Sequence, residues 1–266
     1  MITRCHMPDR EPITTSELST YCACQRRYYL KYVLRLSPST KYEALRFGSC
    51  WHLLQEHRWN GMDYATALET ALTASGDDVD ALMAAQIAGM AQGYYARYGV
   101  ADVTGRELYA EVPFRYPLRG SKSFDVAGKI DGLGVTHGGE YVLVEHKSSG
   151  EDISDGSDYW MRLRHNAQLF QYVCAARENG WNVTRIIYDV ARKPMLKPHA
   201  DQPTLDADGL KVVMCDGERV KKTDGTFKQT ATKDGEVVLS APETIDEYAE
   251  RVAADAIARP EWYFAR

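Results

Sequence analysis

The stretch Gly128-Lys129-Ile130-Asp131, followed by Val144-Glu145-His146-Lys147, predicts two neighbouring β-strands that carry charged side chains. Successive side chains of a strand point to opposite faces, so Glu145 and Lys147 share a face of the sheet. Charged groups on a partly buried face are costly unless they are paired or have a function. Two carboxylates can hold a divalent cation, and a lysine beside them can hold a phosphate or an activated water. The combination favours a metal site that acts on phosphodiesters.

The alternation of apolar and polar residues extends on both sides of this stretch. We expect strands over 107–117, 123–135 and 140–148, then a helix over 157–179 and a β-branched strand over 183–191. In the first strand, the apolar residues at every second position from Leu108 to Phe114 should share one face. The order of three strands, a helix and a strand predicts an α/β fold in which helices flank a central mixed sheet.

The remainder of the chain is expected to be helical at both ends, with an irregular insertion. Residues 1–13 look like a flexible lead-in, and helices are expected over 16–36, 41–59, 62–74 and 78–98, with a closing helix over 243–257. We therefore predict an N-terminal helical region over 1–100 and a core over 101–266, forming together one compact domain. The polar, proline-containing insertion over 194–240 should include a small hairpin between Val212-Val213 and Val237-Val238-Leu239.

The composition limits the class of protein. The chain has 266 residues, six cysteines and a formal net charge of −5. No apolar run approaches the roughly 18 residues of a membrane span, and the polar N-terminus lacks a secretory signal. The cysteines do not form a disulfide framework, so we expect a cytoplasmic protein of a bacterial or phage-infected cell. The net charge argues against a wholly basic nucleic-acid coat, but it is compatible with a local basic groove.

Five pieces of sequence occur in a characteristic order: 16–21 with 24–32, 47–52, 111–114 ahead of 128–131, 145–148, and 168–172. In this order they resemble the PD-(D/E)XK nucleases of the RecB-like branch, which also contains CRISPR-associated and phage exonucleases. The E-x-K signature at Glu145-His146-Lys147 occurs by chance in many proteins, but the ordered set is fairly specific. The resemblance covers about residues 14–192 and implies a restriction-endonuclease-like core and DNA cleavage supported by Mg²⁺ or Mn²⁺.

The resemblance gives roles to the charged residues of the two central strands. Asp131 and Glu145 are expected to bind the metal ion, with the backbone carbonyl of His146 as a further ligand; hard oxygen ligands suit Mg²⁺ or Mn²⁺. Lys147 is expected to orient the attacking water or to stabilise the phosphate in the transition state. Without the surrounding motifs these side chains would be surface charges that contribute little.

Four more residues are candidates with open alternatives. His52 is expected to bind the metal through a ring nitrogen, or else to be a core histidine bonded to the backbone. Glu111 either completes the metal shell, directly or through water, or is an ordinary exposed strand residue. Gln168 and Tyr172 lie four residues apart on one helix face. Gln168 would hold Lys147 or the attacking water, and Tyr172 would contact a DNA phosphate; the alternative is a polar stripe at the edge of the core.

The helix expected over 16–36 interleaves cations with tyrosines. Arg26, Arg27 and Lys31 could neutralise phosphates, and the tyrosines could stack on unpaired bases. The alternative is an amphipathic helix with tyrosines in the core and a solvated charged face. Arg164, four residues before Gln168, is a weaker candidate for a phosphate contact.

One departure from the family pattern concerns iron. Many relatives hold a [4Fe–4S] cluster with one early cysteine and three near the C-terminus. Cys24 or Cys22 lies at the early position, but no cysteine follows Cys215. Because such a cluster needs four thiolates, we predict no iron–sulfur cluster here.

The sequence therefore favours a metal-dependent DNA exonuclease that serves recombination, repair or phage DNA processing, with DNA and recombination or replication proteins as partners. A second hypothesis is a nucleic-acid-binding subunit of a recombination complex with little cleavage of its own. A third is an interaction protein whose carboxylates bind metal for stability. The sequence leaves open whether the insertion is a DNA clamp, an interaction arm or a spacer.

Overall fold

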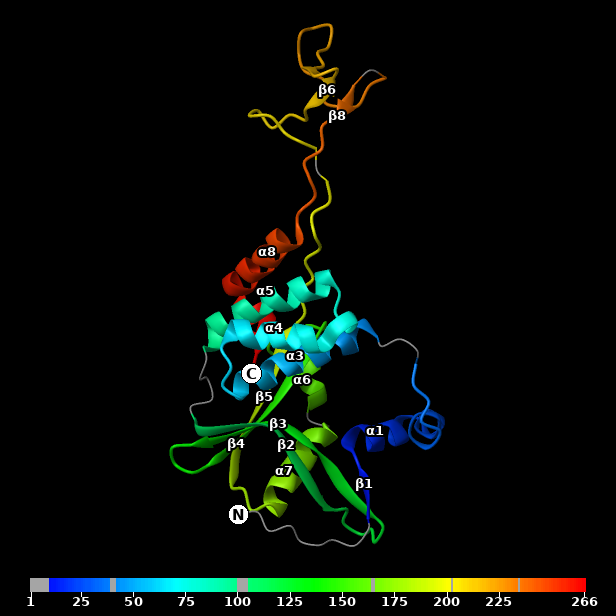
Figure 1. Cartoon of the computed structure of the whole chain (residues 1–266), viewed down its shortest axis with the longest axis vertical. Coiled ribbons are helices and arrows are strands. Elements are labelled where there is room, and N and C mark those ends of the chain that lie inside the picture. Colours follow the sequence, from blue (N-terminus) through cyan, green and yellow to red (C-terminus); the bar gives the residue numbers. More distant parts are fainter. Residues whose placement is uncertain (1–9, 39–41, 100–104, 164–165, 202, 234) are drawn as a thin grey trace.

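A mixed β-sheet lies at the centre of the molecule, as the computed structural model shows (Figure 1). The structure describes residues 10–38, 42–99, 105–163, 166–201, 203–233 and 235–266. Within these residues the sheet has six strands in the order β1-β3-β4-β5-β9, and β2 pairs with β3. Their bounds are β1 (Glu11–Ile13), β2 (Gly105–Pro117), β3 (Phe124–Thr136), β4 (Tyr141–Ser149), β5 (Val183–Arg192) and β9 (Phe264–Ala265). The predicted α/β class with a mixed sheet is confirmed.

The pairing of β3 with β4 ends abruptly and forms a fork. The two strands pair in antiparallel fashion from Val135↔Tyr141 to Gly132↔Val144. Further along β3, β1 pairs in parallel, from Ile13↔Val126 to Glu11↔Phe124. Between these two pairings, residues 127–131 of β3 have no strand partner on that edge among the described residues. Beyond the fork, β4 continues beside β5 alone, in parallel register.

At the level of the fork, the side chains of β2 change the face of the sheet on which they pack. Leu108 and Ala110 pack with Trp59, whereas Val112 and Phe114 pack with Tyr172 on the opposite face. The expectation that the apolar residues of β2 share one face was therefore wrong. The cause lies at Glu111, which has a positive φ of 50°, a conformation that interrupts regular alternation.

The two faces of the sheet are covered by different helices (Figure 1). The helices α3 (Glu43–Trp59), α4 (Tyr64–Ser75) and α5 (Ala81–Tyr98) form one layer, on which α8 (Ile245–Ala258) packs through α5, and α7 (Ala167–Glu178) covers the other face. Side-chain caps start several of them, including Asp63, Asp80 and a capping box of Thr244 with Glu247. None of the helices in the described ranges combines the length and apolar character of a bilayer span.

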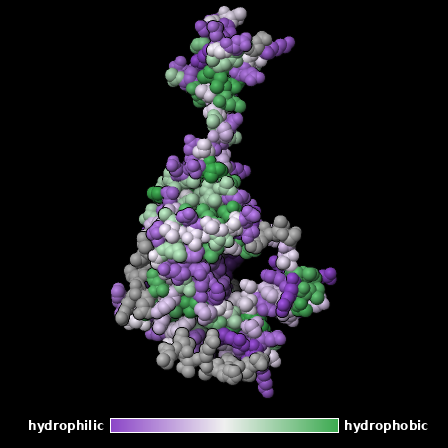
Figure 2. All heavy atoms as spheres, viewed as in Figure 1, coloured by the Kyte–Doolittle hydropathy of each residue, from purple (hydrophilic) through white to green (hydrophobic). Residues whose placement is uncertain are grey.

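The first helical segment is an arm that stands apart from this layer (Figure 2). The expected single helix over 16–36 is interrupted, because Cys24 is extended with a φ of −162°. The arm consists of α1 (Thr15–Ala23), α2 (Gln25–Tyr28) and a π-helical segment η1 (Tyr29–Val33), none of which has a buried residue. Its tyrosines are thus not core residues. The expected lead-in over 1–13 instead ends in β1, while residues 1–9 lie outside the described residues.

Other differences concern the C-terminal half. The helix expected over 157–179 is divided into α6 (Asp158–Leu163) and α7. The short helix α9 (Pro260–Tyr263) and the adjoining strand β9 were not predicted. A 3₁₀ turn η2 (Gly76–Asp78) separates α4 from α5, at the turn that the sequence indicates there. The division into regions at about residue 100 stays a prediction.

The insertion forms a finger that projects from the body (Figure 1). Its small sheet contains β6 (Val213–Cys215), β7 (Glu218–Arg219) and β8 (Glu236–Val237). Val213 pairs with Val237, so the predicted hairpin partners are confirmed. Asp-Gly pairs recur through the finger, at 208–209, 216–217, 224–225 and 234–235. This turn signal could have revealed that the insertion is a series of hairpins.

Candidate active site

The fork between β3 and β4 brings together the two carboxylates that the sequence singled out. The last β3–β4 pair is Gly132↔Val144. Asp131 comes just before Gly132 in β3, and Glu145 comes just after Val144 in β4, so both lie one position beyond this pair. The backbone N–H of His146, released from strand pairing, donates a hydrogen bond to the Asp131 carboxylate at 3.0 Å. The end of the ladder therefore gives Asp131 a fixed orientation beside β4.

Glu145 and Lys147 lie on the α7 side of β4 and form an ion pair. The Lys147 ammonium also donates to the Gln168 amide oxygen at 3.3 Å, and the Gln168 amide nitrogen donates to the Tyr172 hydroxyl at 2.9 Å. The helix α7 begins at the Asn166 cap, which places Gln168 in its first turn. Lysine, glutamine and tyrosine thus form one connected group around Glu145.

Burial makes Glu145 a weaker acid than an exposed glutamate in the metal-free protein. Its side chain is 0% exposed. Burial raises the pKa of Glu145 to about 7; the Lys147 ammonium opposes this shift and the Asp131 carboxylate adds to it. Burial likewise raises the pKa of the Tyr172 hydroxyl far above its usual value, so this group remains a hydrogen-bond donor.

His52 reaches the same place from α3. Its Nδ1 lies 3.4 Å from a carboxylate oxygen of Asp131. Burial lowers the pKa of His52 to about 4, against the attraction of Asp131 and with the repulsion of Lys147. A neutral imidazole has a lone pair for a metal ion. The helix approaches β4 closely at Gly48, where an added Cβ would lie 3.4 Å from the Ser148 hydroxyl.

The donor set suits a hard divalent cation. The Glu145 carboxylate oxygens are buried, and Lys147 is their cationic partner among the described residues. No three histidine, cysteine, aspartate or glutamate side chains in the described part of the chain form a metal cluster by themselves. Mg²⁺ commonly takes one or two carboxylates and keeps several waters. Asp131 and Glu145 therefore fit it, with His52 beside them.

The structure also places the weaker candidates. Glu111 pairs with Lys129 at 3.3 Å and lies across from Asp131, between the pairs Ala110↔Gly132 and Val112↔Ile130. Its role as a ligand stays a prediction. Tyr172 is 3% exposed, so its side chain supports the site from within the core.

The predicted DNA contacts lie mainly on the arm. Arg26, Arg27 and Lys31 are exposed in α2 and η1. The base of the arm is joined to α7 by a hydrogen bond between Thr15 of α1 and Gln171. Arg164 lies outside the described residues. These roles remain predictions.

Asp189 on β5 is a residue of the site region that the sequence did not reveal. It is 2% exposed and lies 2.8 Å from Nδ1 of His146, its neighbour across the β4–β5 pairing. The available signal was a single carboxylate between the apolar pairs Ile186-Ile187 and Val190-Ala191 of β5.

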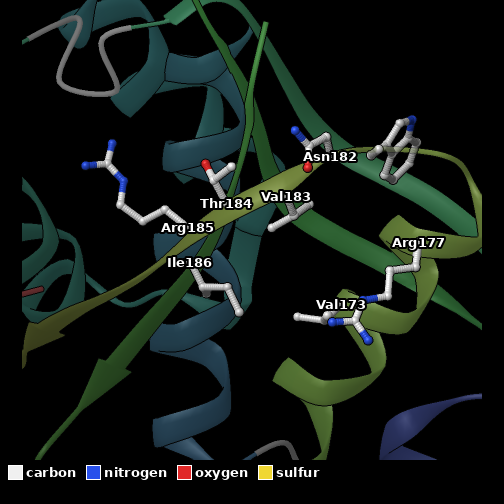
Figure 3. Close-up of a pocket in the computed structure, with 8 residues that line it drawn as sticks. Val173, Arg177, Asn182, Val183, Thr184, Arg185 and Ile186 are labelled. Carbon is white, nitrogen blue, oxygen red and sulfur yellow. The ribbon is translucent and has the colours of Figure 1, made fainter. Parts of the chain in front are cut away.

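Two hollows adjoin β5. A pocket of about 210 Å³ is lined by Tyr188, the strand neighbour of Glu145, with Tyr159, Arg162 and Asn166. A larger pocket of about 410 Å³ lies at the start of β5 and the end of α7, where Arg177 and Trp181 line it (Figure 3). None of the predicted site residues lines either pocket. The smaller pocket adjoins the site through Tyr188, the register partner of Glu145.

Comparisons with known proteins agree with this arrangement at the level of family. A search of curated proteins found no match. One solved structure, titled "Crystal structure of SSO0001", aligns over 86% of this chain and 81% of its own at 13% identity and a TM-score of 0.26, too low to support an argument. The profile of the PD-(D/E)XK nuclease superfamily matches residues 12–263. The chain therefore belongs to the PD-(D/E)XK nuclease superfamily.

Proposed function

We propose that this protein is a metal-dependent DNA exonuclease of the RecB-like branch, which hydrolyses phosphodiester bonds in recombination, repair or phage DNA processing in the cytoplasm. The observation that supports this most directly is the meeting of Asp131, Glu145 and Lys147 at the fork of the sheet. A bound Mg²⁺ or Mn²⁺ would supply positive charge to the phosphate and lower the pKa of the attacking water.

The protein's own groups have distinct tasks in this proposal. Asp131 and Glu145 would hold the cation, with the His146 carbonyl and His52 as further ligands. Lys147, steadied by Gln168 at 3.3 Å, orients the water whose oxygen attacks phosphorus as the bond to the leaving oxygen breaks. Its ammonium also stabilises the negative charge that grows on the phosphate. Because Glu145 must be ionised to bind a cation, binding would displace the proton that burial favours on this carboxyl.

The surroundings of the site are compatible with a nucleic-acid strand. Exposed cations and tyrosines alternate along the arm, as in surfaces that neutralise phosphates and stack on bases. Tyr159, Tyr188 and Arg162 line the hollow beside Glu145. These features support DNA as the substrate.

The decisive experiment is incubation of the purified full chain with end-labelled DNA. Linear single-stranded, linear double-stranded and circular DNA are each tested with Mg²⁺, with Mn²⁺ and with chelator. We expect metal-dependent release of nucleotides from linear DNA and none from circles, and loss of this activity in Glu145→Ala and Lys147→Ala. Cleavage of circles would identify an endonuclease instead. DNA binding without metal-stimulated turnover would favour the binding-subunit hypothesis.

A further inference from the structure

A chain of hydrogen bonds crosses the sheet from the helical layer to the carboxylate of Asp131. Arg266 Nε donates to Asp189 Oδ1 at 3.0 Å, and Arg266 Nη2 donates to the Tyr94 hydroxyl at 2.8 Å. The Tyr94 hydroxyl donates to Asp189 Oδ2, and His146 Nδ1 lies 2.8 Å from the same oxygen. The backbone N–H of His146 then donates to Asp131 Oδ2 at 3.0 Å.

Every link in the middle of this chain is buried. The exposed fractions are 2% for Asp189, 3% for His146 and 0% for Tyr94. A buried carboxylate costs several kcal/mol unless its oxygens are fully bonded. Asp189 meets that requirement with three partners. Because its partners come from different elements, the position of the His146 ring is fixed by packing that does not involve the site itself.

The fork explains why the contact between Asp189 and His146 is important for the site. Up to Val144, β4 is held by β3 on one side and β5 on the other. At Glu145 the β3 ladder has ended, so the ligand-bearing segment keeps only β5 as a strand neighbour among the described residues. His146 and Asp189 are register partners in that remaining pairing. Their side-chain bond therefore adds a lateral restraint where the strand has lost one.

We propose that Asp189 is a positioning residue of the metal site. By holding the His146 ring, it fixes the backbone between Glu145 and Lys147, and through the His146 N–H it fixes the direction of the Asp131 carboxylate. The inference rests on the proposed function, because it takes Asp131 and Glu145 as the cation ligands. Metal sites lose affinity when groups that orient the ligands are removed, typically by about 10–100-fold.

The test measures Mn²⁺ binding to the full chain without DNA, by calorimetry and by electron paramagnetic resonance, alongside thermal unfolding in chelator. We expect Asp189→Ala to weaken Mn²⁺ binding by about 10–100-fold. Asp189→Asn should recover most of the affinity, because its amide oxygen can still accept the hydrogen bond from His146. Equal affinity of wild type and Asp189→Ala would overturn the positioning role alone, whereas a wild type that binds no Mn²⁺ would overturn the proposed function as well.

A matched control separates positioning from general stability. Asp125 is also fully buried on the same sheet and pairs with Arg10 at 2.6 Å and Arg115 at 2.7 Å, but it has no bond to the site among the contacts described. Asp125→Ala should lower the unfolding temperature and leave the Mn²⁺ dissociation constant unchanged.

A second variant keeps the test decisive if Asp189→Ala does not fold. His146→Leu removes the ring contact from the other side and leaves Asp189 its bonds to Arg266 and Tyr94. It should weaken Mn²⁺ binding by about 10–100-fold, as Asp189→Ala does, because both changes remove the same link. Unchanged Mn²⁺ affinity in His146→Leu would overturn the proposal.

Discussion

Glu145 is a carboxylate kept in a place that disfavours its charge. In the free protein its pKa rises to about 7, whereas an unfolded chain would have a value of about 4.3. The folded state thus binds the proton more tightly, and the stability that this provides is complete below the unfolded pKa and lost as the pH rises through 7. Ionised Glu145, the form that binds a cation, therefore lowers the free energy of unfolding of the metal-free protein.

This difference between the folded and unfolded pKa values of Glu145 predicts that Glu145→Gln stabilises the metal-free protein at alkaline pH. The gain in unfolding free energy over wild type should be larger at pH 8 than at pH 5, by at most about 3 kcal/mol, because only the wild type must ionise a buried group. Thermal or urea unfolding in chelator at the two pH values measures it. A gain that does not change with pH would show that Glu145 titrates normally.

Lys147 can be separated from cation binding. Lys147→Met retains the apolar stem of the side chain but removes the ammonium, so we expect cleavage to fall by about 10²–10³-fold while Mn²⁺ binding persists. Loss of the ion pair with Glu145 should also raise the pKa of that carboxyl further. Single-turnover cleavage and calorimetry on the same variant measure the two effects. Undiminished cleavage would remove Lys147 from the proposed mechanism.

The sequence predicted these side chains in two ways: strand alternation placed Glu145 and Lys147 on one face, and the family resemblance singled out Gln168. Glu145, Lys147 and Gln168 were expected to meet, and they do. Asp189 was not identified, since its role depends on the register between β4 and β5. That register is set by contacts distant in sequence, and no pattern within 183–191 specifies it.

Among the elements, the arm offers a test of DNA binding that leaves the fold intact. Replacing Arg26, Arg27 and Lys31 by alanine should weaken binding of single-stranded DNA and reduce the slope of log K against log salt by about 2. The unfolding temperature should not change, because the arm has no buried residue. Fluorescence anisotropy in chelator at several salt concentrations measures the slope. Arg119→Ala with Lys122→Ala and Arg185→Ala removes as many exposed cations elsewhere, and an equal effect of that control would contradict a role for the arm.

The contact between α5 and α8 depends on a glycine. A Cβ at Gly89 would lie 2.6 Å from the Ala249 carbonyl oxygen and 2.7 Å from Val252 Cβ. Gly89→Ala should thus destabilise the protein by about 1–3 kcal/mol, although alanine is the better helix former. Gly138→Ala is the control, since its Cβ would meet no atom nearer than 3.7 Å. Chemical denaturation measures both, and an unchanged midpoint for Gly89→Ala would mean that α8 can move away freely.

Most helices and strands were predictable, but the breaks within them were not. The turn-over of β2 at Glu111 follows from a positive φ at a residue that is not glycine, for which the sequence gives no signal. The interruption of the first helix at Cys24 is similar. At Cys24 the thiol accepts a hydrogen bond from the Arg27 N–H and starts α2 as a new helix. Glu111 lies in the paired sheet, where tertiary contacts override local preference.

At the scale of the whole molecule, the finger is the part least coupled to the rest. Among its described residues only Val213 and Gly235 are buried, and Figure 1 shows it extending away from the body. Its base is held by Glu243, which accepts from the His199 N–H at 2.8 Å and pairs with Arg251 at 2.7 Å. The Glu243 N–H also donates to the His199 carbonyl at 3.1 Å, so the two ends of the finger are neighbours.

This proximity predicts that the finger can be removed without unfolding the body. Replacing residues 200–242 by a short Gly-Ser linker should leave the unfolding temperature of the body and its Mn²⁺ affinity unchanged, because a flexible linker easily spans two hydrogen-bonded residues. Cleavage of short oligonucleotides should persist, since the fork, α3 and α7 are intact. Calorimetry and a comparison of oligonucleotides with long DNA test this. A selective loss on long DNA would assign the finger to a clamp, equal activity on both would leave it as a spacer or interaction arm, and a body that unfolds would show that the finger supports the core after all.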